Sequence, residues 1–210
     1  MCTGGASLFA LIISIFWPVF RSVYLLYKAS RGPSSIQVLI GALDDVNELS
    51  SSVAMSHLSS FGQQAVPYLC AAVEDRNQHH TKRSRAAECL RRIAIMKKGA
   101  ACADMMTTLR VGSIDENDDL RVKCLWALWR CEKRATDVVP GLTALLCSND
   151  EHVVYEAICA LQEIGPGAGA SVNALLELSR NEPLFANNVS DAIRAIRPEP
   201  SKDELKDRNP

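Results

Sequence analysis

Apolar residues recur along this chain with the spacing of one helical face. Five apolar triplets share the offsets zero, four and seven, so that each lies on one side of a helix. Their central residues are Leu58, Leu90, Leu128, Leu161 and Ile193, so successive centres lie 32, 38, 33 and 32 positions apart. Such a regular spacing predicts an internal repeat. The triplets are Ala54/Leu58/Phe61, Ala86/Leu90/Ile93, Cys124/Leu128/Cys131, Ala157/Leu161/Ile164 and Val189/Ile193/Ile196.

A second apolar helical pattern precedes each triplet, so each unit is predicted to be a helix, a turn and a helix. We call the first helix A and the second helix B. Pro67 and Pro140 fall in the first turn of an A helix, where the missing N–H costs nothing. The A patterns are Ile36/Leu39/Leu43, Val66/Leu69/Val73, Ala103/Met106/Leu109, Val139/Leu142/Leu146 and Val172/Leu175/Leu178.

Three segments of the chain resemble HEAT repeats of the phycobilisome-lyase-like subclass: AVPYL, DVVPGLTALL and NDEHVVYEAICALQEIGPGAGASVNALLEL. The likeness covers roughly residues 34–197, and the third A helix departs from it by lacking the proline. It implies an all-α, HEAT-like α-solenoid of about five helix-pair repeats, preceded by one N-terminal hydrophobic helix. It implies less about function, because such repeats serve scaffolds, transport receptors, chromophore-handling proteins and a few enzymes.

The N-terminal segment does not follow the repeat pattern. Residues 8–27 (LFALIISIFWPVFRSVYLLY) have about the length of a bilayer-spanning helix and are interrupted by Pro18 and Arg21. Basic residues follow this segment and none precedes it, which predicts a membrane-associated protein with its repeats in the cytoplasm. A cap or interfacial helix over the first repeat remains the alternative, because the uninterrupted apolar stretch is shorter than a full span.

These patterns divide the chain into three parts. Residues 1–33 form the hydrophobic N-terminal helix, as anchor or cap, with a linker. Residues 34–197 form the repeat domain. Residues 198–210 are charged and contain proline, and we expect a disordered tail.

Composition and spacing favour a protein without a catalytic or metal centre. The 23 basic and 24 acidic residues give a net charge of -1, and the 8 cysteines have no paired spacing, which indicates reduced core thiols. His79 and His80 lie near Asp75, but no further ligand stands at a metal-site spacing. The fold-level resemblance to HEAT-like di-iron hydroxylases fails at the ligands, since the adjacent pair here is the reversed Glu151-His152. We therefore expect no enzyme activity, no cofactor and no metal.

A candidate binding surface emerges from comparing equivalent positions of the repeats. Trp126 and Trp129 stand where the other B helices carry mostly polar residues, and exposed tryptophan is typical of binding hot spots. Beside them, basic residues of the second and third repeats stand at equivalent positions, whereas the fourth repeat has Glu156 and Glu163 at such positions. Alternatively, the tryptophans fill the groove between repeats and the arginines are solvated or paired with Glu88. The predicted partner-binding residues are Trp126, Trp129, Arg85, Arg92, Lys123 and Arg130.

These residues favour a non-catalytic scaffold or adaptor that binds a protein segment, acidic or phosphorylated, on the helix-B surface. Residues 8–27 are predicted to attach this protein to the membrane. The first alternative is a nucleic-acid backbone binder, because residues 82–98 contain seven basic residues and one acid; the balanced net charge argues against it. The second is an accessory protein for chromophore attachment, which the resemblance alone implies.

Overall fold

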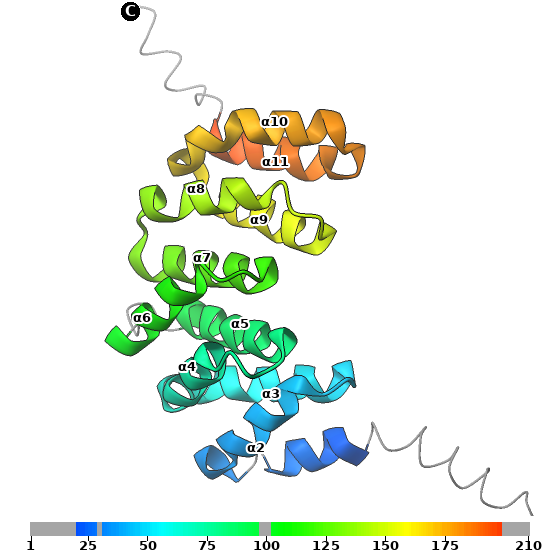
Figure 1. Cartoon of the computed structure of the whole chain (residues 1–210), viewed down its shortest axis with the longest axis vertical. Helices are drawn as coiled ribbons and strands as arrows, with labels where there is room; N and C mark the ends of the chain where they lie inside the picture. Colours follow the sequence, from blue (N-terminus) through cyan, green and yellow to red (C-terminus); the bar gives the residue numbers. More distant parts are fainter. Residues whose placement is uncertain (1–19, 29–30, 97–101, 199–210) are drawn as a thin grey trace, which may run out of the picture. The chain divides into compact units, whose positions relative to one another are not determined.

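A computed structural model of the chain describes residues 20–28, 31–96 and 102–198, and every regular element in these ranges is helical. The all-α fold class is confirmed in this part of the chain. The structure falls into two compact units, residues 1–114 and residues 115–210, and each is described by itself (Figure 1).

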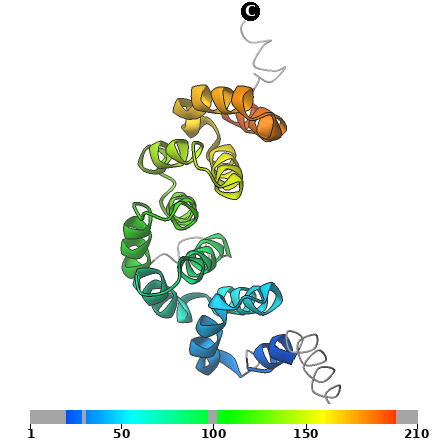
Figure 2. The same cartoon turned by 45° about the vertical axis from the view of Figure 1, so that its right-hand side comes forward.

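The first unit contains two layers of helices. Helix A packs on helix A of the next repeat, as α2 on α4 and α4 on α6, and helix B on helix B, as α3 on α5. Figure 2 shows these layers edge-on. The elements are residues 20–28, η1 (Gly32–Ser35), α2 (Ile36–Gly41), η2 (Ala42–Asp44), α3 (Glu48–Phe61), η3 (Gly62–Gln64), α4 (Val66–Glu74), α5 (His80–Met96) and α6 (Ala103–Gly112).

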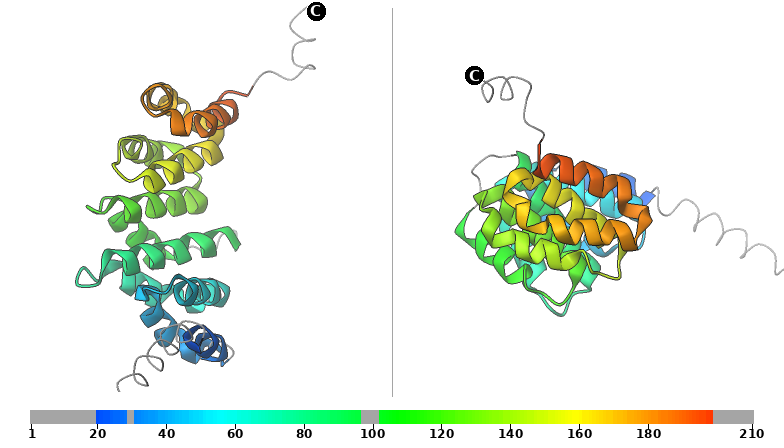
Figure 3. Two further views of the ribbon diagram at one scale, coloured as in Figure 1. Left: turned by 90° about the vertical axis from the view of Figure 1, so that its right-hand side faces the viewer. Right: turned by 90° about the horizontal axis from the view of Figure 1, so that it is seen from above.

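The second unit is also built from stacked helix pairs. Its B helices pack on one another, α7 on α9 and α9 on α11, while α8 contacts both α7 and α9, and α10 contacts α11 (Figure 3). The elements are α7 (Asp118–Glu132), α8 (Ala135–Leu145), α9 (Glu151–Ile164), η4 (Gly165–Ser171), α10 (Val172–Asn181), η5 (Pro183–Phe185) and α11 (Ala186–Ile196).

The helix pairs fall where the sequence predicts them, with one difference. Pro67 lies in the first turn of α4, whereas Pro140 lies inside α8, five residues after its first residue. The triplet centres Leu58, Leu90 and Leu161 are fully buried, and Leu128 is nearly so, whereas Ile193 in the last helix is partly exposed. Burying a leucine side chain contributes about 1.5–3 kcal/mol, so these positions hold each pair to its neighbours.

Three of the B helices begin at a side-chain cap. The side chains of Asn47, Asn117 and Asp150 accept hydrogen bonds from backbone N–H groups of the first turns of α3, α7 and α9. Such a cap contributes roughly 1 kcal/mol, because it satisfies an N–H that has no partner inside the helix. In these three repeats, the end of the turn that leads into helix B is therefore held by a side-chain hydrogen bond.

The predicted membrane location needs correction. No helix in the described part of the chain is long and apolar enough to cross a bilayer. Residues 8–19 of the predicted anchor lie outside that part, and residues 20–28 pack on the first repeat instead. The Ser22 and Ser50 hydroxyls lie 3.3 Å apart, Arg21 forms an ion pair with Asp45, and Leu25 is buried.

The described cysteines are free thiols, several of them in the helical core. Cys70, Cys89 and Cys124 are buried. Burial disfavours the thiolate, and it raises the pKa of Cys70 to about 11 and that of Cys89 to about 12. These side chains therefore act as small apolar packing groups, as the sequence predicts.

Candidate functional site

Helix α7 carries four of the six residues predicted to bind a partner. Lys123, Trp126 and Arg130 follow one another at spacings of three and four, which places them along one side of the helix. Trp129 lies three residues after Trp126, about 60° round the helix. All four therefore lie on adjoining parts of the α7 surface.

Trp126 and Arg130 share one acceptor on α9. The indole Nε1 of Trp126 donates to Oε2 of Glu163 at 2.7 Å, and Arg130 donates to the same oxygen. The guanidinium carbon lies 5.5 Å from the centre of the Trp126 ring system, within the range of a cation–π contact. The carboxylate of Glu163 thus fixes both side chains and ties α7 to α9.

Trp129 forms a second aromatic–cation pair one turn further along. The Nζ of Lys133 lies 4.8 Å from the ring centre of Trp129. Lys133 ends α7 with a left-handed backbone (φ 56°), and its N–H donates to the carbonyl of Trp129. The indole Nε1 of Trp129 is buried and has no hydrogen-bond partner in the described part of the chain. Both tryptophans remain partly exposed. We call Trp126, Trp129, Arg130 and Lys133 the tryptophan surface.

Lys123 lies inside the protein rather than on its surface. Its side chain is 8% exposed, and its ammonium binds the carboxylates of Asp119 and Glu156, the latter at 3.2 Å. Burial by itself lowers the pKa of Lys123, but the two carboxylates outweigh it and raise the pKa above its usual range. This lysine is already used to join α7 to α9.

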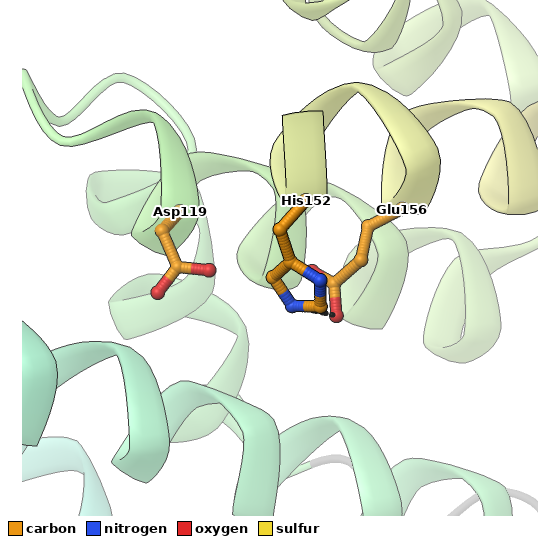
Figure 4. Close-up of side chains that lie close together, drawn as sticks. All are labelled: Asp119, His152 and Glu156. Carbon is orange, nitrogen blue, oxygen red and sulfur yellow. Dashed lines mark ion pairs between the residues drawn. The ribbon is translucent and has the colours of Figure 1, made fainter. Parts of the chain in front are cut away.

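The same carboxylates belong to a cluster with metal-ligand chemistry. Oxygen and nitrogen atoms of Asp119, His152 and Glu156 lie within 4.8 Å of one another, Asp119 projecting from α7 and the other two from α9 (Figure 4). His152 Nε2 is 3.5 Å from Glu156 Oε1. The Lys123 ammonium, however, already contacts both carboxylates and supplies the positive charge that a metal ion would bring. We therefore assign these carboxylates to the lysine.

The other two predicted residues lie on α5 of the first unit. Arg85 donates to the carbonyl oxygens of Leu43 at 2.8 Å and Asp45 at 3.1 Å, which fastens α5 to the turn that follows the first A helix. Arg92 donates to the carboxylate of Glu88 at 2.8 Å. Both arginines thus have acceptors within their own unit.

Glu88 is a buried carboxylate held by two arginines. Its oxygens accept from Arg91 at 2.6 and 2.8 Å and from Arg92. Burial raises the pKa of Glu88, but the hydrogen bonds and charges of Arg91 and Arg92 outweigh it and leave the pKa below its usual range. The ionised form is therefore the one that the fold stabilises.

This lowered pKa predicts an acid-dependent loss of stability. Because the folded pKa lies below the unfolded one, Glu88 should stabilise the fold above about pH 4.3, and its contribution should fade as the pH falls through the lowered value. Urea unfolding from pH 7 to pH 3 should show wild type and Glu88→Gln converging as the pH drops. A difference that stays constant or widens on acidification would contradict this assignment.

Each cation of the predicted site already has an internal acceptor. Arg85 binds carbonyl groups, and Arg92, Lys123 and Arg130 each bind a glutamate. An acidic or phosphorylated partner would have to compete with these acceptors. Within the second unit, the structure brings the tryptophans together with Lys123 and Arg130, whose charges are largely balanced by Glu156 and Glu163.

Sequence reasoning offered Glu88 as an acceptor for the arginines but did not identify the acceptors of Lys123 and Arg130, although a signal for them was present. Lys123 and Glu156, and Arg130 and Glu163, are each 33 residues apart, the same spacing as that between Leu128 and Leu161. Each cation therefore meets the residue at its equivalent position in the next repeat.

Comparisons with known proteins identify no family for this chain. No family model matches it, and no curated protein matches it. Among solved structures, it is similar to the complex of CpcE and CpcF of phycocyanin lyase from Nostoc sp. PCC7120. The identity is 15%, the TM-score is 0.37, and the match covers 83% of this chain and 86% of that one. The helical-repeat fold is thus confirmed by the structure itself, and the HEAT subclass stays a prediction.

Proposed function

We propose that this protein is a non-catalytic, helical-repeat adaptor that binds a partner protein on the tryptophan surface of α7. The observation that carries the proposal is the pair of partly exposed indoles. Over each indole ring lies the cationic side chain of the residue four positions later, Arg130 over Trp126 and Lys133 over Trp129. Tryptophan and arginine are the residues most enriched among binding hot spots.

The tryptophan surface is also ordered before a partner arrives. Glu163 holds the indole of Trp126 and the guanidinium of Arg130, so these side chains would lose little conformational freedom on binding. Since Glu163 balances Arg130, we expect the partner to offer apolar or aromatic side chains rather than an acidic run. This replaces the acidic or phosphorylated segment favoured by the sequence.

The nucleic-acid alternative is disfavoured by the contacts of α5. Lys82 binds Gln78, Arg83 binds the carbonyl of Val73, and Arg85 binds two further carbonyls. Side chains held in this way do not form a free row of cations for phosphates. An accessory role in chromophore attachment rests on the sequence resemblance alone, and no contact in the described part of the chain adds to it.

The test compares partner capture by the full chain and by single variants, with bound proteins quantified by mass spectrometry. Trp126→Ala and Trp129→Ala should each reduce the captured partner at least about tenfold, as for hot-spot residues. Tyr155→Ala, which removes an exposed aromatic ring of the same unit, is the matched control and should bind like wild type. Circular dichroism should show all three folded.

Salt dependence separates this function from phosphate binding. Capture through the tryptophan surface should change little between 50 and 300 mM NaCl, whereas nucleic-acid binding weakens steeply over such a range. Equal capture by wild type and both tryptophan variants would refute the proposal and leave the indoles as packing groups.

A further inference from the structure

The second unit contains a groove that the tryptophan surface does not use. It has a volume of about 460 Å³ and lies between the turn joining α8 to α9, the first turn of α9, one side of α10 and η5. Its floor is apolar and consists of Leu146, Val154, Leu178 and Phe185, all of which are buried.

The rim of the groove carries negative charge. Glu151, Glu177 and Glu182 line it, and all three are exposed. None has an ion pair in the described part of the chain, and no Lys or Arg is among the lining residues. The groove therefore combines an apolar floor with three carboxylates that form no ion pair within the described residues.

We propose that this groove binds a basic segment of a partner protein. An aliphatic or aromatic side chain of that segment rests on the floor, and a neighbouring lysine or arginine lies among the three rim carboxylates. Apolar burial supplies attraction, and opposite charges at the rim select a basic sequence over an acidic one.

The chain's own C-terminal residues are a poorer match for this rim. Residues 199–210 contain four acidic and three basic side chains, so their balance is negative like that of the groove. Like charges across an interface disfavour binding. Charge complementarity therefore favours a separate, basic partner.

The groove and the tryptophan surface can be tested independently. Glu151 of the rim and Glu163, which binds Trp126 and Arg130 of the tryptophan surface, lie at opposite ends of α9, twelve residues or about 18 Å apart along its axis. A substitution at one end should leave the other site intact, so failure of this proposal and failure of the proposed function are distinguishable.

The experiment selects binders to the full-length protein from a random library of displayed 12-residue peptides. Enriched peptides should carry lysine or arginine next to a leucine or an aromatic residue. Their affinity, measured by fluorescence anisotropy of the synthetic peptide, should fall about tenfold or more in the triple variant Glu151→Gln, Glu177→Gln, Glu182→Gln. Ala174→Phe, which narrows the groove without changing its charge, should also weaken binding.

A matched control removes the same amount of charge elsewhere in the unit. Glu116→Gln, Asp137→Asn and Asp191→Asn alter three exposed carboxylates outside the groove and should leave peptide affinity within about twofold of wild type, as should Trp129→Ala. Three results would overturn the proposal: no enrichment of basic peptides, equal weakening by both triple variants, or enrichment of peptides that copy residues 199–210. The last would assign the groove to the chain's own tail.

Discussion

Replacing Glu156 by leucine should lower the free energy of unfolding by about 3 kcal/mol. The change leaves the Lys123 ammonium buried with one carboxylate, that of Asp119, where it now has two. A buried charge that loses a partner cannot recover its hydration, so the cost is larger than the value of a surface ion pair. Urea unfolding followed by circular dichroism at pH 7 measures the loss.

A second substitution distinguishes a buried ion pair from simple packing. Lys123→Met in the Glu156→Leu background removes the stranded charge and should restore most of the stability, since a well-packed apolar pair can replace a buried salt bridge. If the double variant is no more stable than Glu156→Leu alone, the charge assignment is wrong.

The raised pKa of Lys123 also implies a pH dependence. The contribution of this ammonium to the free energy of unfolding is present at neutral pH and is lost above about pH 10.5.

Leu161→Ala should cost roughly 3–4 kcal/mol, the other large effect expected in this unit. Leu161 is fully buried near the C-terminal end of α9, the helix that packs on α7, α8 and α11. Removing its isobutyl group loses transfer free energy and leaves a cavity that the surrounding helices close only in part.

Two controls accompany this measurement in the same urea series. Leu161→Met conserves volume and should cost less than about 1.5 kcal/mol, and Leu176→Ala alters a partly exposed leucine and should cost about 1 kcal/mol or less. Similar losses in Leu161→Ala and Leu176→Ala would show that position 161 is not a core position.

The helix pairs were predictable because burial leaves a periodic trace. Leu58, Leu90 and Leu161 mark one face each, and every helix needs such a face to pack. Asn47 and Asn117 could have been read as caps, since each stands just before a B helix. The short η5 turn left no such trace, because three residues are too few for a period, and yet it places Phe185 in the floor of the groove.

The candidate site was predictable only in part, because sequence shows which side chains are unusual and not what they touch. Trp126 and Trp129 stood out against their equivalents and are partly exposed. The contacts of Arg85 could not be predicted, since its acceptors are backbone carbonyls, which every residue has. Lys123 was taken as a surface cation, although Glu156 at the equivalent position of the next repeat was the available clue.

The pairing of Lys123 with Glu156 and of Arg130 with Glu163 gives the repeats of the second unit a fixed order. The cations of these pairs belong to α7 and the carboxylates to α9. The paired faces of the two helices therefore have opposite charges, and a second copy of either face would meet it with the same charge. If the α8–α9 pair were copied in tandem, Glu156 and Glu163 would each face their own duplicate, and carboxylate would meet carboxylate. Copying this pair alone would therefore bring like charges together and destabilise the array, unless the copy also changed its charge.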